Sequence, residues 1–177
     1  MSIPNILTML RFILIPVFAY TYIVLDSVPL SATILALSGI TDFLDGFIAR
    51  RFNMITKWGI VFDPIADKLT LITVALCISL SGIKFMWALF GFLVFKELLM
   101  ILGGINLYKK GDVVVPANWY GKAATILFYL LFFMLIIFGG NLNEAAKNAM
   151  IFISIALGVF ALIRYSMLFF VMKRTLK

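Results

Sequence analysis

Long apolar runs with few charges are the feature that most restricts the folds open to this chain. The run over residues 117–139, for example, contains one charged residue, Lys122. Each run is close to the ~20 residues that a helix needs to cross the hydrocarbon of a bilayer. Transmembrane strands would alternate apolar and polar residues, and these runs do not alternate. We therefore predict an all-α integral membrane protein with six transmembrane helices, over residues 6–25, 29–49, 60–83, 85–108, 117–139 and 147–172.

Composition supports this fold class, because the chain is 64% hydrophobic and only 13% charged. Ordinary soluble domains have about 25% charged residues and so can cover their surface with polar groups. There is no internal repeat, low-complexity stretch or linker, so we predict a single membrane domain over residues 1–177. The N-terminal run lacks a basic start and a clear small-residue cleavage site. We interpret it as a retained first membrane helix and not as a signal peptide.

The distribution of Lys and Arg predicts the orientation of the helices. Ten basic residues lie at one set of helix ends and two at the opposite set, so the first set, which includes both termini, should be cytoplasmic. The net charge of +7 then forms a basic rim that attracts anionic headgroups and phosphorylated substrates, and we predict no nucleic-acid partner. The first set is Arg11, Arg50, Arg51, Lys57, Lys109, Lys110, Lys122, Lys173, Arg174 and Lys177, and the second is Lys84 and Lys147.

The chain has no histidine and one cysteine. The lack of histidine excludes His-based catalytic triads, His general bases and His-ligated zinc. Cys77 lies inside an apolar run, and we interpret it as a small buried hydrophobic residue. Acid–base and metal chemistry must therefore fall mainly to carboxylates.

Four aspartates lie at neighbouring helix ends. Asp42 and Asp45 come near the inner end of the second segment, and Asp63 and Asp67 come at the inner start of the third. Spacings of three and four residues place each pair on one face of its helix. A short turn joins the two segments, so they should be antiparallel neighbours. We therefore expect all four carboxylates to converge at a similar depth.

Clustered carboxylates at membrane depth repel one another and are costly to bury. Protonation or bound cations would reduce this cost. A site of carboxylates alone suits a hard divalent ion such as Mg²⁺ or Mn²⁺, and four could hold two ions. Two such ions can clamp the oxygens of a phosphoryl group during transfer. The alternative is that the aspartates cap helix ends or pair with Arg50, Arg51 and Lys68.

These residues form the pattern Asp42-x2-Asp45-Gly46-x2-Ala49-Arg50-x8-Gly59-x3-Asp63-x3-Asp67. The pattern resembles the signature of the CDP-alcohol phosphotransferase family, with every fixed position present. The resemblance implies a six-helix membrane enzyme, commonly a homodimer, that transfers a phosphatidyl or similar group from a CDP-linked donor to an alcohol and releases CMP. It also implies that the four aspartates bind two divalent cations and that Asp67 acts as the catalytic base. The CDP site would be lined by Gly46, Ala49, Arg50 and Gly59.

The opening "IPNILTMLRFILIP" resembles the start of the bacterial phosphatidylglycerophosphate synthases within that family. Asn5, Thr8 and Arg11 have the matching spacing, and we assign Asn5 and Thr8 to the CDP site. This resemblance implies CDP-diacylglycerol as donor, glycerol 3-phosphate as acceptor and a bacterial plasma membrane with the active site facing the cytoplasm. The chain has Lys96-Glu97 where this group usually has Arg-Glu. Phosphatidylglycerol, which would give cardiolipin, and inositol phosphate therefore stay open as acceptors.

A glycerol 3-phosphate acceptor would need a cationic pocket for its phosphate. The candidates are Arg51, Lys110, Lys122 and Arg164, of which Arg164 lies within the last apolar segment. Anchoring at the cytoplasmic face is the alternative role for these residues. A function of a different class, a cation or proton transporter that uses the aspartates as a relay, also stays open. Such a carrier would more often bind its ions near the middle of the bilayer.

Overall fold

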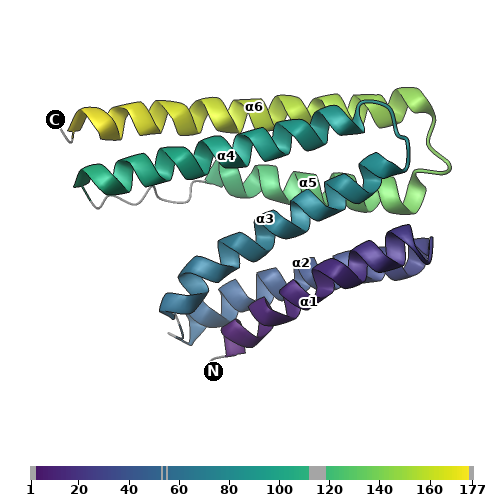
Figure 1. Ribbon diagram of the computed structural model, residues 1–177, viewed down its shortest axis with the longest axis horizontal. Coiled ribbons are helices and arrows are strands. Elements are labelled where there is room, and N and C mark those ends of the chain that lie inside the picture. The colour runs from purple at the N-terminus through teal and green to yellow at the C-terminus, as the bar shows by residue number, and fades with distance from the viewer. Residues whose placement is uncertain (1–2, 53, 55, 112–118, 176–177) are drawn as a thin grey trace. The chain divides into compact units, whose positions relative to one another are not determined.

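The computed structural model describes residues 3–52, 54, 56–111 and 119–175, with the side chains of residues 4–49, 51, 52, 54, 56, 58, 59, 62–103, 121 and 123–169. The described residues form six helices and no strand, which confirms the predicted all-α fold (Figure 1). The helices are α1 (Ile3–Ile23), α2 (Val28–Arg51), α3 (Lys57–Leu80), α4 (Met86–Gly111), α5 (Trp119–Phe138) and α6 (Glu144–Thr175).

Within the described residues, four helices contain apolar stretches long enough to cross a bilayer. These stretches are Pro4–Ile23, Val28–Ala49, Met86–Gly103 and Glu144–Phe169, and α5 adds a shorter one, Ala123–Phe138. In contrast, α3 has Asp63, Asp67 and Lys68 in its first half, so its apolar stretch is shorter. The described helices thus fit a membrane protein in which one end of α3 is polar.

Local sequence explains where α2 and α3 begin. Asp26 adopts the left-handed conformation (φ +45°) in the turn after α1, a conformation that Asp tolerates better than most residues. Pro29, at the second position of α2, needs no hydrogen-bond partner for its nitrogen there. Thr56 caps α3, because its side chain accepts a hydrogen bond from the Gly59 N–H at 3.0 Å. This cap explains why α3 begins at Lys57 instead of at the predicted residue 60.

The chain divides into two compact units. The first comprises Met1–Ile83 and Phe132–Leu142, and the second Lys84–Leu131 and Asn143–Lys177. The single domain expected over residues 1–177 stays a prediction.

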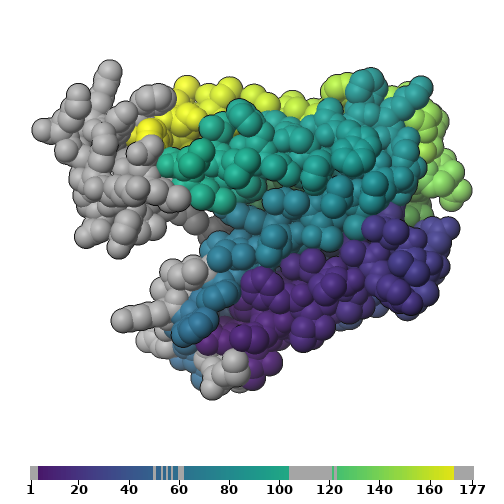
Figure 2. Space-filling view, viewed as in Figure 1, coloured from purple at the N-terminus to yellow at the C-terminus, as the bar shows by residue number. Residues whose placement is uncertain are grey.

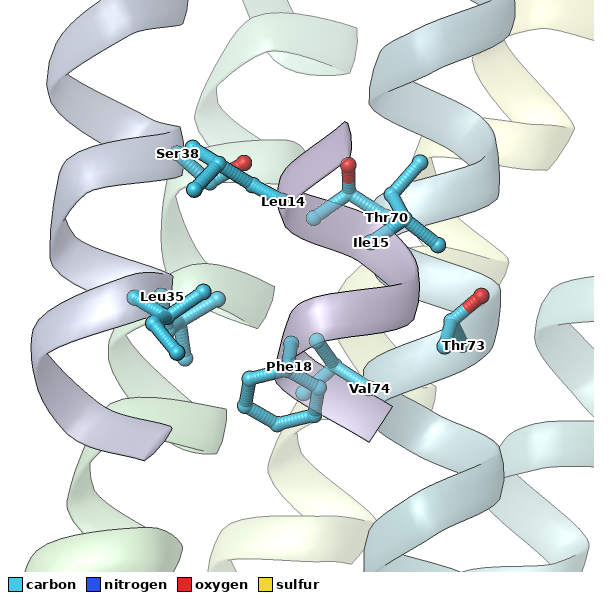
Figure 3. A pocket seen from close by; sticks show the side chains of 9 residues that line it. Leu14, Ile15, Phe18, Leu35, Ser38, Thr70, Thr73 and Val74 are labelled. Carbon is cyan, nitrogen blue, oxygen red and sulfur yellow. The ribbon is translucent and has the colours of Figure 1, made fainter. Parts of the chain in front are cut away.

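In the first unit, α2 and α3 pack on α1. Both α2 and α3 make extensive contacts with α1 and few with each other. Figure 3 shows side chains of all three helices around a small cavity of about 10 Å³, with Phe18 on α1, Leu35 on α2 and Val74 on α3. The opposite face of α1 is exposed, as its purple surface in Figure 2 shows. Its exposed side chains, such as Ile6, Ile13 and Val17, are apolar and fit contact with lipid.

In the second unit, α4 packs against α6, and the two run side by side in Figure 1. Gly158 on α6 permits this approach, because a Cβ atom there would lie 2.4 Å from the ring of Phe92. A buried ion pair lies on α4, where Lys96 Nζ is 2.7 Å from Glu97 Oε1. The ammonium group of Lys96 is also 5.6 Å from the ring centroid of Phe128 on α5.

Candidate active site

Three polar side chains lie along one face of α1 in the first unit. Asn5, Thr8 and Arg11 are spaced three residues apart, so they lie along the same side of the helix. Thr8 is buried, and the side chain of Arg11 has no exposed surface. A fully buried guanidinium is costly unless it is paired, so its partners define the site.

The partners of Arg11 are the four aspartates. Arg11 Nη1 is 2.9 Å from Asp42 Oδ1 and also donates to Asp67. Arg11 Nη2 donates to Asp45 and is 3.8 Å from Asp63 Oδ1. The carboxylates of α2 and α3 therefore meet at one point, as their spacing predicts. They meet through α1, since α2 and α3 pack mainly on that helix and not on each other.

The formal charges of Arg11 and the four aspartates do not sum to zero. If all four carboxylates are ionised, one guanidinium leaves a formal charge of −3. Among the described residues, no three acidic or Cys side chains form a ready metal-binding group, and the guanidinium lies between the carboxylates. Their chemistry nevertheless fits hard divalent cations, because every available ligand is a carboxylate oxygen. Asp45 is buried, but 35%, 33% and 29% of the Asp42, Asp63 and Asp67 side chains are exposed, which gives ions access.

Polar side chains of α1 also reach the start of α3. Thr8 Oγ1 lies 3.0 Å from the Pro4 carbonyl oxygen and hydrogen-bonds to Asp63. Thr56 Oγ1 donates to Asn5 Oδ1 at 2.7 Å. These bonds hold α1 against the first turns of α3 beside the carboxylates.

Gly59 lies among these groups. A Cβ atom there would be 3.2 Å from Thr56 Oγ1, 3.3 Å from Asp63 Oδ2 and 3.5 Å from Asn5 Oδ1. The missing side chain therefore leaves room for the polar groups to approach the α3 backbone.

A cavity of about 480 Å³ lies beside the carboxylates, between α1 and α3. This volume is within the range of small-molecule sites, about 300–1,000 Å³. Its polar wall is made by Asn5, Thr8 and Gly59, and Thr8 also bonds to Asp63. The apolar wall is made by Met9, Phe12, Trp58 and Phe62, and the Trp58 and Phe62 rings stack with centroids 5.0 Å apart.

Comparison with known proteins identifies a family that matches most of this chain. The family model of the CDP-alcohol phosphatidyltransferases matches residues 1–161. The chain belongs to this family. The match spans both compact units and includes the whole aspartate signature.

Three curated relatives illustrate the range of names in the family. A putative cardiolipin synthase of Mycobacterium tuberculosis is 35% identical over 133 residues, covering 75% of this chain and 63% of that protein. A CMP-forming cardiolipin synthase of Streptomyces coelicolor is 32% identical over 146 residues, covering 80% and 67%. The CDP-diacylglycerol–glycerol-3-phosphate 3-phosphatidyltransferase of Aquifex aeolicus is 36% identical over 128 residues, covering 71% and 70%. The chain thus spans about 63% of the length of the mycobacterial relatives.

The other residues of the family signature are only partly described. Gly46 and Ala49 are half-buried on α2, within one or two turns of Asp42 and Asp45, and they are not among the residues that line the 480 Å³ cavity. The side chain of Arg50 lies outside the described residues. The CDP-binding role of these three residues stays a prediction.

Two of the four residues of the predicted acceptor pocket, Arg51 and Arg164, have described side chains. Arg51 is exposed at the end of α2 in the first unit, and Arg164 is exposed on α6 in the second. The side chains of Lys110 and Lys122 lie outside the described residues. The shared phosphate site of these four residues stays a prediction.

Sequence reasoning does not predict the place of Arg11 at the candidate site. Its sequence position indicates only a charge at a cytoplasmic helix end and a part in the family resemblance. Two signals could have identified it, namely an arginine inside an apolar run and its position in step with Asn5 and Thr8.

Proposed function

We propose that this protein transfers the phosphatidyl group of CDP-diacylglycerol to glycerol 3-phosphate, giving phosphatidylglycerophosphate and CMP. It would then act in phospholipid biosynthesis as a CDP-diacylglycerol–glycerol-3-phosphate 3-phosphatidyltransferase. Membership of the CDP-alcohol phosphatidyltransferase family and the name of the Aquifex relative support the proposal. The observation that carries it is the meeting of four carboxylates, Asp42, Asp45, Asp63 and Asp67, beside a cavity of ligand size.

The cofactors that fit this arrangement are two Mg²⁺ or Mn²⁺ ions held by the four aspartates. When bound, they would neutralise the pyrophosphate of the donor and stabilise charge on its oxygens. The family and the carboxylate-only donor set support this assignment.

The residues of this chain would bind the donor and move one proton. Asn5, Thr8 and Gly59 line the cavity and would bind the CDP group, together with Gly46, Ala49 and Arg50 of the family signature. Asp67 would accept the proton of the acceptor hydroxyl. The acceptor oxygen would then bond to the phosphorus that carries the lipid, and the bond from that phosphorus to CMP would break.

The proposed setting is a bacterial plasma membrane, with a homodimer whose active sites face the cytoplasm. The asymmetry of Lys and Arg supports this orientation, although buried Arg11 no longer counts as a surface charge. The acyl chains of the donor would then lie in the inner leaflet. The family resemblance supports the dimer.

A second acceptor, phosphatidylglycerol, is favoured by a specific observation. The mycobacterial and Streptomyces relatives, which match 133 and 146 residues, are both named as cardiolipin synthases. That reaction would use the same donor and the same carboxylates. The acceptor phosphate candidates Arg51, Lys110, Lys122 and Arg164 would then contact a lipid phosphate instead of free glycerol 3-phosphate.

A panel of acceptors separates these functions. The purified protein is supplied with CDP-diacylglycerol, Mg²⁺ and, in turn, glycerol 3-phosphate, phosphatidylglycerol or inositol phosphate, and the lipid product is identified by mass spectrometry. We expect phosphatidylglycerophosphate from glycerol 3-phosphate. Cardiolipin from phosphatidylglycerol alone would establish the second function, and no product from any acceptor would contradict both.

A further inference from the structure

Arg11 occupies the position where the carboxylates of α2 and α3 meet. Its side chain has no exposed surface, and its two Nη groups lie within 4 Å of all four aspartates. Within the described part of the chain, Nε has no hydrogen-bond partner. The head group is therefore held by the carboxylates alone.

The carboxylates that hold Arg11 are the same groups that would bind a divalent ion. Asp42 Oδ1, Asp45 Oδ2 and Asp67 Oδ1 all accept hydrogen bonds from the guanidinium. A Mg²⁺ ion requires carboxylate oxygens at about 2.0–2.1 Å and in a near-octahedral arrangement. A guanidinium that lies between these carboxylates competes with the ion for space and for carboxylate oxygens.

The charge of the cluster gives Arg11 a role when no ion is bound. Four ionised carboxylates without a counter-charge would repel one another strongly in the interior of a membrane protein. Arg11 reduces the formal charge from −4 to −3 and bonds to carboxylates on both helices. Since α2 and α3 make few direct contacts with each other, the guanidinium is the main polar link between their acidic faces.

We propose that Arg11 is a resident counter-cation, which holds the carboxylates together in the ion-free protein and gives up carboxylate oxygens when divalent ions bind. This inference rests on the proposed divalent-ion site. It makes Arg11 a positioning residue for the four aspartates and a competitor of the ions. Ion affinity is then lower than the four carboxylates alone would provide.

Titration with Mn²⁺ alone tests the competition. The full-length protein is freed of ions with a chelator in detergent, the chelator is removed, and free Mn²⁺ is followed by electron paramagnetic resonance. We expect Arg11→Met to lower the Kd for Mn²⁺ about tenfold, because one unit of competing positive charge a few ångström away is removed. An unchanged or higher Kd in a folded Arg11→Met protein would overturn the proposal.

A matched control removes a cation far from the site. Lys84 is exposed in the turn before α4. It follows the end of α3 at Leu80, which already lies about 20 Å along that helix from Asp67 at 1.5 Å per helical residue. Lys84→Met should bind Mn²⁺ as the wild type does. A tenfold gain in this control as well would show a general effect of net charge and would also overturn the proposal.

The ion-free state gives a second readout. Without ions, Arg11→Met should unfold at a lower temperature than the wild type, and saturating Mn²⁺ should raise its midpoint by more than it raises that of the wild type. Equal midpoints without ions would contradict the holding role.

If Arg11→Met does not fold, the wild type still decides the question. In nuclear magnetic resonance spectra, the ¹⁵Nη signals of Arg11 are identified because they are absent from the spectrum of the Arg11→Lys variant. These signals should shift when Mg²⁺ saturates the site. Unchanged signals would overturn the proposal.

The two levels of proposal can fail separately. No saturable binding of Mn²⁺ by the wild type would remove the divalent-ion site and, with it, the role of Arg11. Saturable binding that Asp63→Asn abolishes, together with ion-dependent CMP release, would support the site even where Arg11→Met fails to bind Mn²⁺ more tightly. In that case only the role of Arg11 is lost.

Discussion

Gly59 lies where polar side chains of the site come close to the α3 backbone. Replacing it with Ala would place a Cβ atom 3.3 Å from Asp63 Oδ2 and 3.2 Å from Thr56 Oγ1, so these groups would have to shift by a few tenths of an ångström. We expect Gly59→Ala to reduce kcat/KM for CDP-diacylglycerol about tenfold, since it disturbs one of the four carboxylates and the cavity wall. Stability should change little, because Ala favours a helix by about 0.5–1 kcal/mol over Gly and offsets the crowding.

Gly91 provides the matched control for this substitution. It also lies within a helix, α4, but a Cβ atom there would have no neighbour within 4 Å. Gly91→Ala should therefore keep full activity and unfold at the same or a slightly higher temperature. Full activity in Gly59→Ala would show that the space at Gly59 has no part in the reaction.

At the residue scale, the sequence predicted the acidic half of the site and missed its cation. The spacing of Asp42, Asp45, Asp63 and Asp67 fixes which helix face each occupies, so their convergence could be foreseen. The position of Arg11 among them depends on how α1 packs on α2 and α3, which local periodicity does not reveal. A positive charge near a membrane surface is also explained by the positive-inside rule, so the sequence alone did not indicate that Arg11 lies among the carboxylates.

At the scale of a single element, the start of α3 depends on Thr56. Its hydroxyl accepts from Gly59 N–H at 3.0 Å and donates to Asn5 at 2.7 Å, so one side chain both caps α3 and links it to α1. We expect Thr56→Ala to lower the free energy of unfolding by about 1 kcal/mol, the usual cost of a lost N-cap. Thr56→Ser should lose little, because it keeps the hydroxyl. Unfolding in detergent, followed by circular dichroism, measures both.

Thr33 on α2 is the control for the loss of a threonine hydroxyl. It is exposed, and among the described residues its hydroxyl bonds within its own helix, to the Pro29 carbonyl oxygen at 2.8 Å. Thr33→Ala should stay within about 0.5 kcal/mol of the wild type. If Thr56→Ala changed the free energy of unfolding as little as Thr33→Ala does, Thr56 would not stabilise the start of α3.

The helices themselves were largely predictable, because apolar length is a strong signal in a membrane protein. Their ends were less so. Hydropathy alone placed the start of the third helix at residue 60, whereas the cap at Thr56 extends α3 back to Lys57. The extra turn matters, since it brings Trp58 and Gly59 into the helix and therefore into the cavity wall.

At the scale of the whole molecule, orientation is a separate prediction from fold. It can be tested with single cysteines in a Cys77→Ala background. Met54, between α2 and α3, and Asn141, between α5 and α6, are both exposed and lie at predicted cytoplasmic and external ends. In intact cells, an impermeant maleimide should label Asn141→Cys, and it should label Met54→Cys only after permeabilisation.

The opposite labelling pattern would show that the excess of Lys and Arg does not mark the cytoplasmic side. It would also place the carboxylates near the outer surface, away from a cytoplasmic supply of glycerol 3-phosphate.

The acceptor pocket also belongs to the scale of the whole molecule. Arg51 and Arg164 lie in different units of the chain, so a pattern of residues along the sequence cannot show whether they share one site.

The central claim is that the four aspartates form one divalent-ion site for transfer from CDP-diacylglycerol. Release of CMP by the purified protein, with and without Mg²⁺, tests it most directly, with Asp67→Asn as the variant. We predict release by the wild type that requires both Mg²⁺ and an alcohol acceptor, and loss of release in an Asp67→Asn protein that remains folded. Near-normal release by Asp67→Asn, or release by the wild type in the presence of a chelator, would contradict the claim.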